Sequence, residues 1–189
     1  MKKNIMTITD WVHSVLAASI EEGDFCIDAT AGKGKDTLFL AQQTGKTGRV
    51  LAFDIQPDAI RQAEQLVREH GYSEQVQFVL NGHENMDQYA LADSAAVILF
   101  NLGYLPGGDH SVATKESTTL EAAKKGLEIL KKQGVMCICI YSGRDSGFLE
   151  KKAVLSWVQN LPAKEYDVIV CSFMNKPNNP PLPVFIRKR

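Results

Sequence analysis

Hydrophobic positions along the chain gather in short apolar runs that are separated by longer segments with helical spacing. The short runs, which we expect to form strands, cover residues 25–28, 49–54, 76–80, 95–100 and 135–141. Apolar positions recur at helical intervals in the other segments, which predicts helices over residues 7–20, 36–43, 57–70, 114–131 and 148–161. Strands that alternate with helices in this way are typical of a parallel sheet with helical crossovers.

The pattern changes towards the end of the sequence, where two apolar runs follow each other without a helix between them. These runs cover residues 166–174 and 184–187, and the segment that connects them is rich in proline and asparagine. Such a short connection cannot carry a parallel crossover, so the two strands should pair antiparallel. We therefore predict an α/β fold in one domain over residues 1–189, with a doubly wound, mostly parallel sheet and an antiparallel C-terminal strand.

Composition and charge narrow the classes of protein to consider. The 189 residues are 44% hydrophobic and 23% charged, as in ordinary globular domains, and the formal net charge is −1. This charge excludes a basic surface over the whole molecule but allows a local basic patch. No apolar run approaches the roughly 18–20 residues of a membrane span, and the N-terminus does not resemble a signal peptide. We expect a cytoplasmic protein with no membrane partner.

The cysteines show no sign of disulfide or metal chemistry. Cys26, Cys137, Cys139 and Cys171 lie in apolar runs and lack the Cys-x-x-Cys spacing of zinc and redox sites. We expect four buried thiols and no bound metal.

A glycine loop follows the first predicted strand. It runs from Asp28 to Asp36, and its residues Gly32 and Gly34 let the backbone turn tightly and approach a ligand. Asp54 closes the second strand, where a carboxylate can accept both hydroxyl groups of a ribose. A plain strand-to-helix turn with a capping aspartate is the alternative interpretation.

Departures from known phosphate-binding patterns indicate which nucleotide the loop would take. Thr37 stands where a dinucleotide fingerprint has its third glycine, and the sequence contains no P-loop motif. Asp28 would repel a pyrophosphate group but attract an ammonium group. One carboxylate for an ammonium group and another for a ribose suit S-adenosylmethionine, which carries both groups.

The glycine loop is similar to the D/E-x-G-x-G-x-G motif of class I S-adenosylmethionine-dependent methyltransferases, with Thr30 in place of the first glycine. The resemblance covers nearly the whole chain and implies a Rossmann-like methyltransferase sheet. In that family the acid after the second strand binds the ribose, and residues after the third strand flank the adenine. The residues that the resemblance assigns to the donor are Asp28, Thr30, Gly32, Lys33, Gly34, Asp36, Asp54, Gln56, Gly82, His83 and Asn101.

A second motif follows the strand predicted over residues 95–100. Asn101-Leu-Gly-Tyr104 resembles the [D/N]-P-P-[Y/F] tetrad of methyltransferases that act on amino nitrogens, with Leu-Gly in place of Pro-Pro. An attacking amine must point its lone pair at the methyl group, so its hydrogens need acceptors such as the Asn101 oxygen. Tyr104 could stack on a base, and Asp109, His110 or water could take a proton from the amine. A polar strand end followed by a flexible turn is the alternative.

Taken together, the motifs resemble one small bacterial family, first described as rRNA methylases. The matching stretches include Asp28–Thr37, Asn81–His83 and Asn101–His110, and the resemblance extends to about Gly147. The family methylates the 5-aminomethyl group of the wobble 2-thiouridine in tRNA. The resemblance implies that this chain is such an enzyme, with a tRNA anticodon stem-loop as its partner. A different amine, in rRNA or in a small molecule, is the alternative acceptor.

Contacts with RNA would need local positive charge. The candidates for phosphate contacts are Lys33, Lys35, Arg144 and the basic stretch 187–189, and Tyr104 and His110 are candidates for contacts with the target nucleotide. We interpret His13 and His70 as structural residues, and the sequence leaves a homodimer open.

Two other functional classes fit the motifs of this sequence less well than a methyltransferase does. An NAD(P)-dependent reductase would need the third loop glycine and a Tyr-x-x-x-Lys pair, and the sequence has neither. A non-catalytic RNA-binding module would not need Asp28, Asp54 and Asn101 together.

Overall fold

The computed structural model describes residues 7–103, 114–141, 144–177 and 179–189. Tyr104, Asp109 and His110 lie outside these ranges. The elements are, in chain order, α1 (Ile8–Ala17), β1 (Phe25–Asp28), α2 (Lys35–Thr44), β2 (Arg49–Asp54), α3 (Pro57–Glu69), β3 (Val76–Leu80), the 3₁₀-helix η1 (His83–Gln88), β4 (Ala95–Leu102), α4 (Glu116–Ile129), β5 (Leu130–Ile140), α5 (Arg144–Gln159), β6 (Tyr166–Val170) and β7 (Leu182–Lys188).

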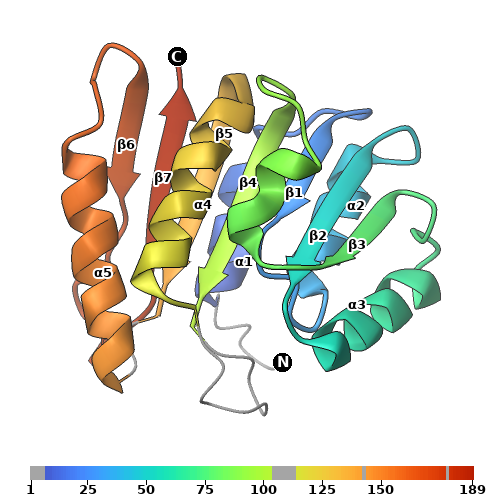
Figure 1. The fold of residues 1–189 in the computed structure, drawn as a ribbon, viewed down its shortest axis with the longest axis horizontal. Helices are drawn as coiled ribbons and strands as arrows, with labels where there is room; N and C mark the ends of the chain where they lie inside the picture. The colour runs from blue at the N-terminus through green and yellow to red at the C-terminus, as the bar shows by residue number, and fades with distance from the viewer. Residues whose placement is uncertain (1–6, 104–113, 142–143, 178) are drawn as a thin grey trace.

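The strands form one sheet in the order β3-β2-β1-β4-β5-β7-β6 (Figure 1). The first five strands pair in parallel, and β7 pairs antiparallel with both β5 and β6. The order reverses between β1 and β4, because the chain first builds outwards from β1 to β3 and then returns to the other side of β1. The prediction of a doubly wound, mostly parallel sheet with an antiparallel C-terminal strand is confirmed.

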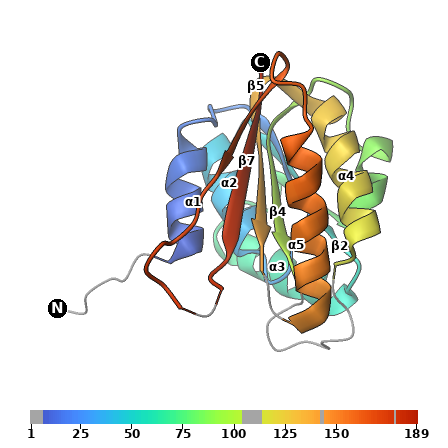
Figure 2. The ribbon, with the colours of Figure 1, turned by 90° about the vertical axis from the view of Figure 1, so that its left-hand side faces the viewer.

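Helices cover both faces of the sheet, as the edge-on view shows (Figure 2). One face packs against α1, α2 and α3, and the other face packs against η1, α4 and α5. Side chains of β4 alternate between the two layers: Val97 and Leu99 join the core under α1 and α2, whereas Ile98 and Phe100 join the core under α4. The same alternation directs the next residue, Asn101, towards the layer of α1 and α2.

The junction between α4 and β5 differs from the predicted boundary at residue 131. Helix α4 ends at Ile129 and β5 begins at the next residue. Gln133 has a positive φ of 67°, and the pairing of β4 with β5 shifts register between Ala95 and Val97. A Cβ atom on Gly134 would lie 2.8 Å from the carbonyl oxygen of Lys131. The polar residues 131–133 continue the helical pattern of the sequence, so the pattern does not mark this irregular start of the strand.

Two further boundaries differ from the sequence-based expectation. Strand β6 ends at Val170 rather than at residue 174. The N–H of Cys171 still donates to the Pro183 carbonyl at 2.9 Å, but proline has no N–H group to return the second bond of the ladder. Helix α5 begins at Arg144, four residues before the predicted start.

The expectation of four buried thiols was wrong for Cys171, which is only partly buried, whereas Cys26, Cys137 and Cys139 are buried.

Candidate active site

Three polar side chains lie at the carboxyl ends of three neighbouring strands, at the lower edge of the sheet in Figure 1. Asp28 ends β1, Asp54 ends β2, and Asn101 is the penultimate residue of β4. Because β1 lies between β2 and β4, the fold brings these ends together from positions far apart in the sequence. In open α/β sheets, this edge at the reversal of strand order is where ligands bind.

Asp28 is fully buried at the start of the glycine loop. Its carboxyl accepts hydrogen bonds from the Thr37 hydroxyl at 2.6 Å and from the Thr30 backbone N–H at 3.1 Å. Burial, followed by the repulsion from Asp36, raises the pKa of Asp28 to about 7. A buried carboxyl group beside other carboxylates is an electrostatic site for a cation.

Asp54 fixes the other side of the loop. Its two carboxylate oxygens accept hydrogen bonds from the backbone N–H groups of Gly32 and Gln56, each at 2.9 Å. Every carboxylate oxygen can accept more than one hydrogen bond, so Asp54 still has capacity for a ligand hydroxyl. The loop and the end of β2 are therefore held in one arrangement by an acid that remains available for binding.

The loop needs glycine at position 34 because of both its backbone conformation and its neighbours. Gly34 has a φ of 81°, and its N–H donates to the Ala31 carbonyl at 2.8 Å. A Cβ atom there would lie 2.7 Å from the Cα atom of Ala63 in α3. The absent side chain lets the start of α2 approach α3.

Asn101 is held at two points. Its backbone N–H donates to the Thr30 hydroxyl at 2.7 Å, and its side-chain Nδ2 donates to the carboxylate of Asp36. The threonine that replaces the first motif glycine thus ties the loop to β4. The other Asp36 oxygen lies 2.5 Å from the Nε2 atom of His13, in α1. The sequence did not anticipate this contact, since no spacing pattern relates residues 13, 36 and 101.

His83 enters the site from η1. Its Nδ1 atom lies 3.2 Å from the carbonyl oxygen of Ala29, at the base of the loop, and its ring packs edge-on against Phe100. Burial lowers the pKa of His83, which favours the neutral ring. Among the described residues its Nε2 atom has no hydrogen-bond partner, although it is buried. With Nδ1 donating to the carbonyl, Nε2 is an acceptor that a ligand N–H could satisfy.

The candidate RNA-binding residues that the structure describes fall in three places. Lys33 and Lys35 are exposed and line a shallow groove between α2 and α3 that also contains Gln62 and Gln65. Arg144 is the first residue of α5, which follows the carboxyl end of β5.

The basic stretch 187–189 lies at the opposite edge of the sheet, because β7 runs antiparallel to β5. The Lys188 ammonium there is 2.8 Å from Asp93, and Arg189 pairs with Asp167. The candidate phosphate contact at residues 187–189 therefore lies at the edge of the sheet opposite the strand-end site.

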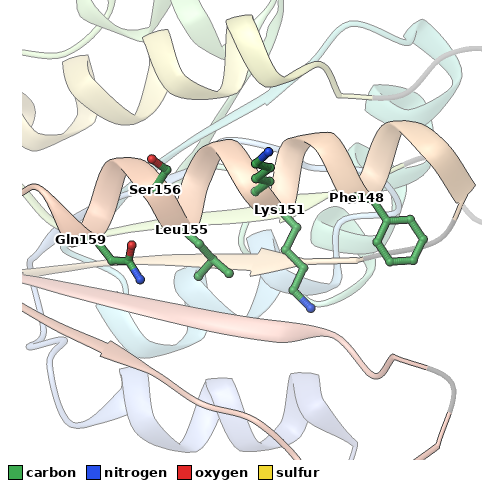
Figure 3. A pocket seen from close by; sticks show the side chains of 6 residues that line it. Phe148, Lys151, Leu155, Ser156 and Gln159 are labelled. Atoms are coloured by element: carbon green, nitrogen blue, oxygen red, sulfur yellow. The ribbon is translucent and has the colours of Figure 1, made fainter.

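A second groove follows α5 and is lined by Phe148, Lys151, Lys152, Leu155, Ser156 and Gln159 (Figure 3). It shares no residue with the site at the strand ends and contains no carboxylate, histidine or cysteine.

Within the described ranges, no cluster of three or more histidine, cysteine or acidic side chains is arranged to hold a metal ion. None of the described helices is both long enough and apolar enough to cross a membrane.

Known proteins with related sequences identify the family of this chain. Residues 50–187 match the sequence model of the family described as "Putative rRNA methylase". A chloroplastic tRNA (mnm5s2U34)-methyltransferase from Arabidopsis thaliana is 35% identical over 192 residues, which cover 96% of this chain and 69% of that protein.

Solved structures of similar sequence have the same fold. A structure described as "putative rRNA-methylase", from Clostridium thermocellum, is 38% identical with a TM-score of 0.94, and the match covers 98% of this chain and 100% of that chain. A structure described as "a putative methyltransferase", from Streptococcus mutans in complex with SAH, is 34% identical with a TM-score of 0.88, over 98% of this chain and 99% of that chain. Since the family match spans well over half of the sequence, this chain belongs to the rRNA methylase family.

Proposed function

We propose that the protein is an S-adenosylmethionine-dependent N-methyltransferase. Its substrate in this proposal is the 5-aminomethyl-(2-thio)uridine at the wobble position of tRNA, which becomes 5-methylaminomethyl-(2-thio)uridine. The observation that carries the proposal is the position of Asn101 at the strand ends, where its nitrogen donates to Asp36 and its side-chain oxygen has no hydrogen-bond partner among the described residues. The similarity to a tRNA (mnm5s2U34)-methyltransferase over 96% of the chain supports the choice of acceptor.

The residues around the loop fit the methyl donor. The buried carboxyl of Asp28 suits the donor's ammonium group, and Asp54 suits its ribose hydroxyls. The Nε2 atom of His83, which has no partner among the described residues, offers an acceptor to the adenine amino group. Gly82 directly precedes His83, and Gln56 follows the end of β2. The loop backbone at Thr30, Gly32, Lys33 and Gly34 would surround the amino-acid portion. S-adenosylmethionine supplies a methyl group on a positively charged sulfur, which a neutral amine can attack.

Asn101 would bind the acceptor through its side-chain oxygen. An amine hydrogen donated to this oxygen turns the nitrogen lone pair away from Asn101 and fixes its direction. An alkylamine that rests as an ammonium must first lose one proton, which Asp109, His110 or water would accept. After that, one N–C bond would form as the S–C bond breaks, and the products would be a methylated ammonium group, which takes over the positive charge, and a neutral thioether.

Recognition of the RNA would be local. Lys33, Lys35 and Arg144 would contact phosphates, and Tyr104 would stack on the target base. An anticodon loop presents unpaired bases, so a small number of contacts at the edge of the site is enough.

Mass spectrometry of nucleosides tests this function directly. Incubation with S-adenosylmethionine and tRNA that carries 5-aminomethyluridine should add one CH₂ unit to that nucleoside. Asn101→Ala should lower the turnover roughly 100-fold or more and leave the donor affinity within about twofold, because only the orientation of the acceptor is lost. The family description favours rRNA as the competing acceptor, so ribosomal RNA should be assayed in parallel. Methylation of rRNA or of a small amine, with none of the tRNA, would replace the proposed acceptor.

A further inference from the structure

A chain of three side chains connects the first helix to the end of β4. His13 in α1 contacts one oxygen of Asp36 at 2.5 Å, and Asn101 donates its side-chain Nδ2–H to the other oxygen. The side chains of His13 and Asp36 are only 21% and 13% exposed. Both oxygens of this nearly buried carboxylate are therefore engaged by defined partners.

The chemistry of the groups determines their orientation. A carboxylate can only accept hydrogen bonds, so the atom of Asn101 that faces Asp36 must be the NH₂ group. The Asn101 oxygen then has to point the other way. For the same reason, the His13 nitrogen that faces Asp36 must carry a hydrogen. An asparagine without this carboxylate could rotate its amide by half a turn and present NH₂ to the acceptor, which would repel the hydrogens of an amine.

The surroundings hold His13 in place. Its ring is stacked on Phe39 of α2, with 3.9 Å between the ring centroids and an angle of 4° between the planes. Asp36 is in the first turn of the same helix α2, so the His13 ring packs on the helix that carries its hydrogen-bond partner. Together with the Thr30 hydroxyl on the backbone N–H, this arrangement fixes both the position and the amide orientation of Asn101.

We propose that Asp36, held by His13, is a positioning residue that keeps the Asn101 oxygen turned towards the acceptor amine. This inference rests on the proposed N-methyltransferase function and assigns α1 a role in turnover. It also gives Asp36 a function through Asn101 in place of a direct contact with the donor.

Paired substitutions at His13 test the role with a conservative rescue. His13→Leu removes the hydrogen-bond donor and should lower kcat about tenfold, while the KM for S-adenosylmethionine stays within twofold. His13→Gln can still donate to Asp36 and should keep kcat within about threefold of the wild type. Trp11→Leu is a matched control on the same helix, because it removes an edge-on contact with Phe185 and does not touch Asp36. Equal losses in the Leu and Gln variants, or an unchanged kcat in His13→Leu, would overturn the proposal.

A measurement on the wild-type protein separates this inference from the assignment of the substrate. NMR of the Asn101 side-chain NH₂ group should show one hydrogen shifted downfield and protected from exchange, because Asp36 binds it. Asp36→Ala should abolish both features, and the protein needs no RNA for this experiment. Free exchange of the wild-type NH₂ group would disprove the positioning role even if tRNA is methylated. Protection without methylation of the tRNA would retain the positioning of Asn101 and reject the proposed acceptor.

Discussion

Asp28 is a carboxyl group that the fold buries completely next to other acidic side chains. Its neighbours Asp36 and Asp54 both repel its negative charge, and burial adds the largest contribution, so the pKa rises to about 7. Near neutral pH the free protein therefore exists as a mixture of protonated and ionised Asp28. A bound ammonium group would favour the ionised form and lower this pKa again.

The donor affinity should depend on pH for this reason. Below pH 7 the free protein is increasingly protonated at Asp28, and binding of the ammonium group must expel that proton, so the affinity should fall by up to about tenfold per pH unit. Titration calorimetry with S-adenosylhomocysteine between about pH 5.5 and 8 measures this dependence.

Asp28→Asn provides the control for this titration. The variant should bind weakly at every pH, and its affinity should not follow the same curve. Since the raised pKa of Asp28 means that its stabilising contribution is lost as pH rises through about 7, the variant should also unfold at a higher temperature than the wild type at pH 8. A wild-type affinity that is constant across this range would show that Asp28 does not bind the ammonium group.

At the scale of elements, the close approach of α2 to α3 depends on one glycine. Gly34 combines a φ of 81° with a Cβ position only 2.7 Å from Ala63 Cα. Gly71 has a similar φ of 77°, but a Cβ atom there would meet nothing within 4 Å. The two glycines thus separate the cost of backbone strain from the cost of a steric clash.

Gly34→Ala should lower the free energy of unfolding by about 2–4 kcal/mol, since strain and overpacking both contribute. Gly71→Ala should lower it by about 1–2 kcal/mol from strain alone. Chemical denaturation of both variants gives the comparison. Equal destabilisation would mean that α3 moves away from the loop at little cost.

The sequence predicted the alternation of strands and helices well, because buried parallel strands are continuous apolar runs and helices have a different period. It also identified Asp28, Asp54 and Asn101 as strand-end residues, since polar side chains there interrupt apolar runs. The strand order β2-β1-β4, which the structure shows, is what brings these three strand ends together. The early start of β5 was missed, because Lys131, Lys132 and Gln133 are polar residues that continue the helical pattern.

The contact between His13 and Asp36 could not be predicted from the sequence. It depends on how α1 lies across α2, and packing between two helices leaves no signal in the spacing of either one. The sequence analysis interpreted His13 as a structural residue. The short helix η1 was also missed, since its six residues are too few to show helical periodicity.

For the molecule as a whole, positive charge is distributed unevenly with respect to the site. At the edge opposite the site, Lys188 and Arg189 are engaged by Asp93 and Asp167. Lys33 and Lys35 are exposed next to the loop. A molecule with a net charge of −1 should therefore bind RNA through few phosphates, with a weak dependence on salt.

With about three phosphate contacts, the slope of log K against log salt concentration should be about −2, by the rule of roughly −0.7 per contact for single strands. Lys35→Ala should reduce the slope by about 0.7 and weaken binding. Lys132→Ala, which changes an exposed lysine near the start of β5, at the far edge of the sheet, should leave the slope unchanged. Fluorescence anisotropy with a labelled anticodon stem-loop measures both, and equal effects would argue against binding at the loop.

The position of β7 between β5 and β6 has a consequence for how the protein is made on the ribosome. Residues 182–188 come last among the described elements, yet they pair with strands on both sides and contribute Val184, Phe185 and Ile186 to both cores. Until they emerge from the exit tunnel, β5 has an unsatisfied edge, and β6 has no strand to pair with. The nascent chain must therefore wait for its final strand, and shielding of that edge by a chaperone would matter most during this interval.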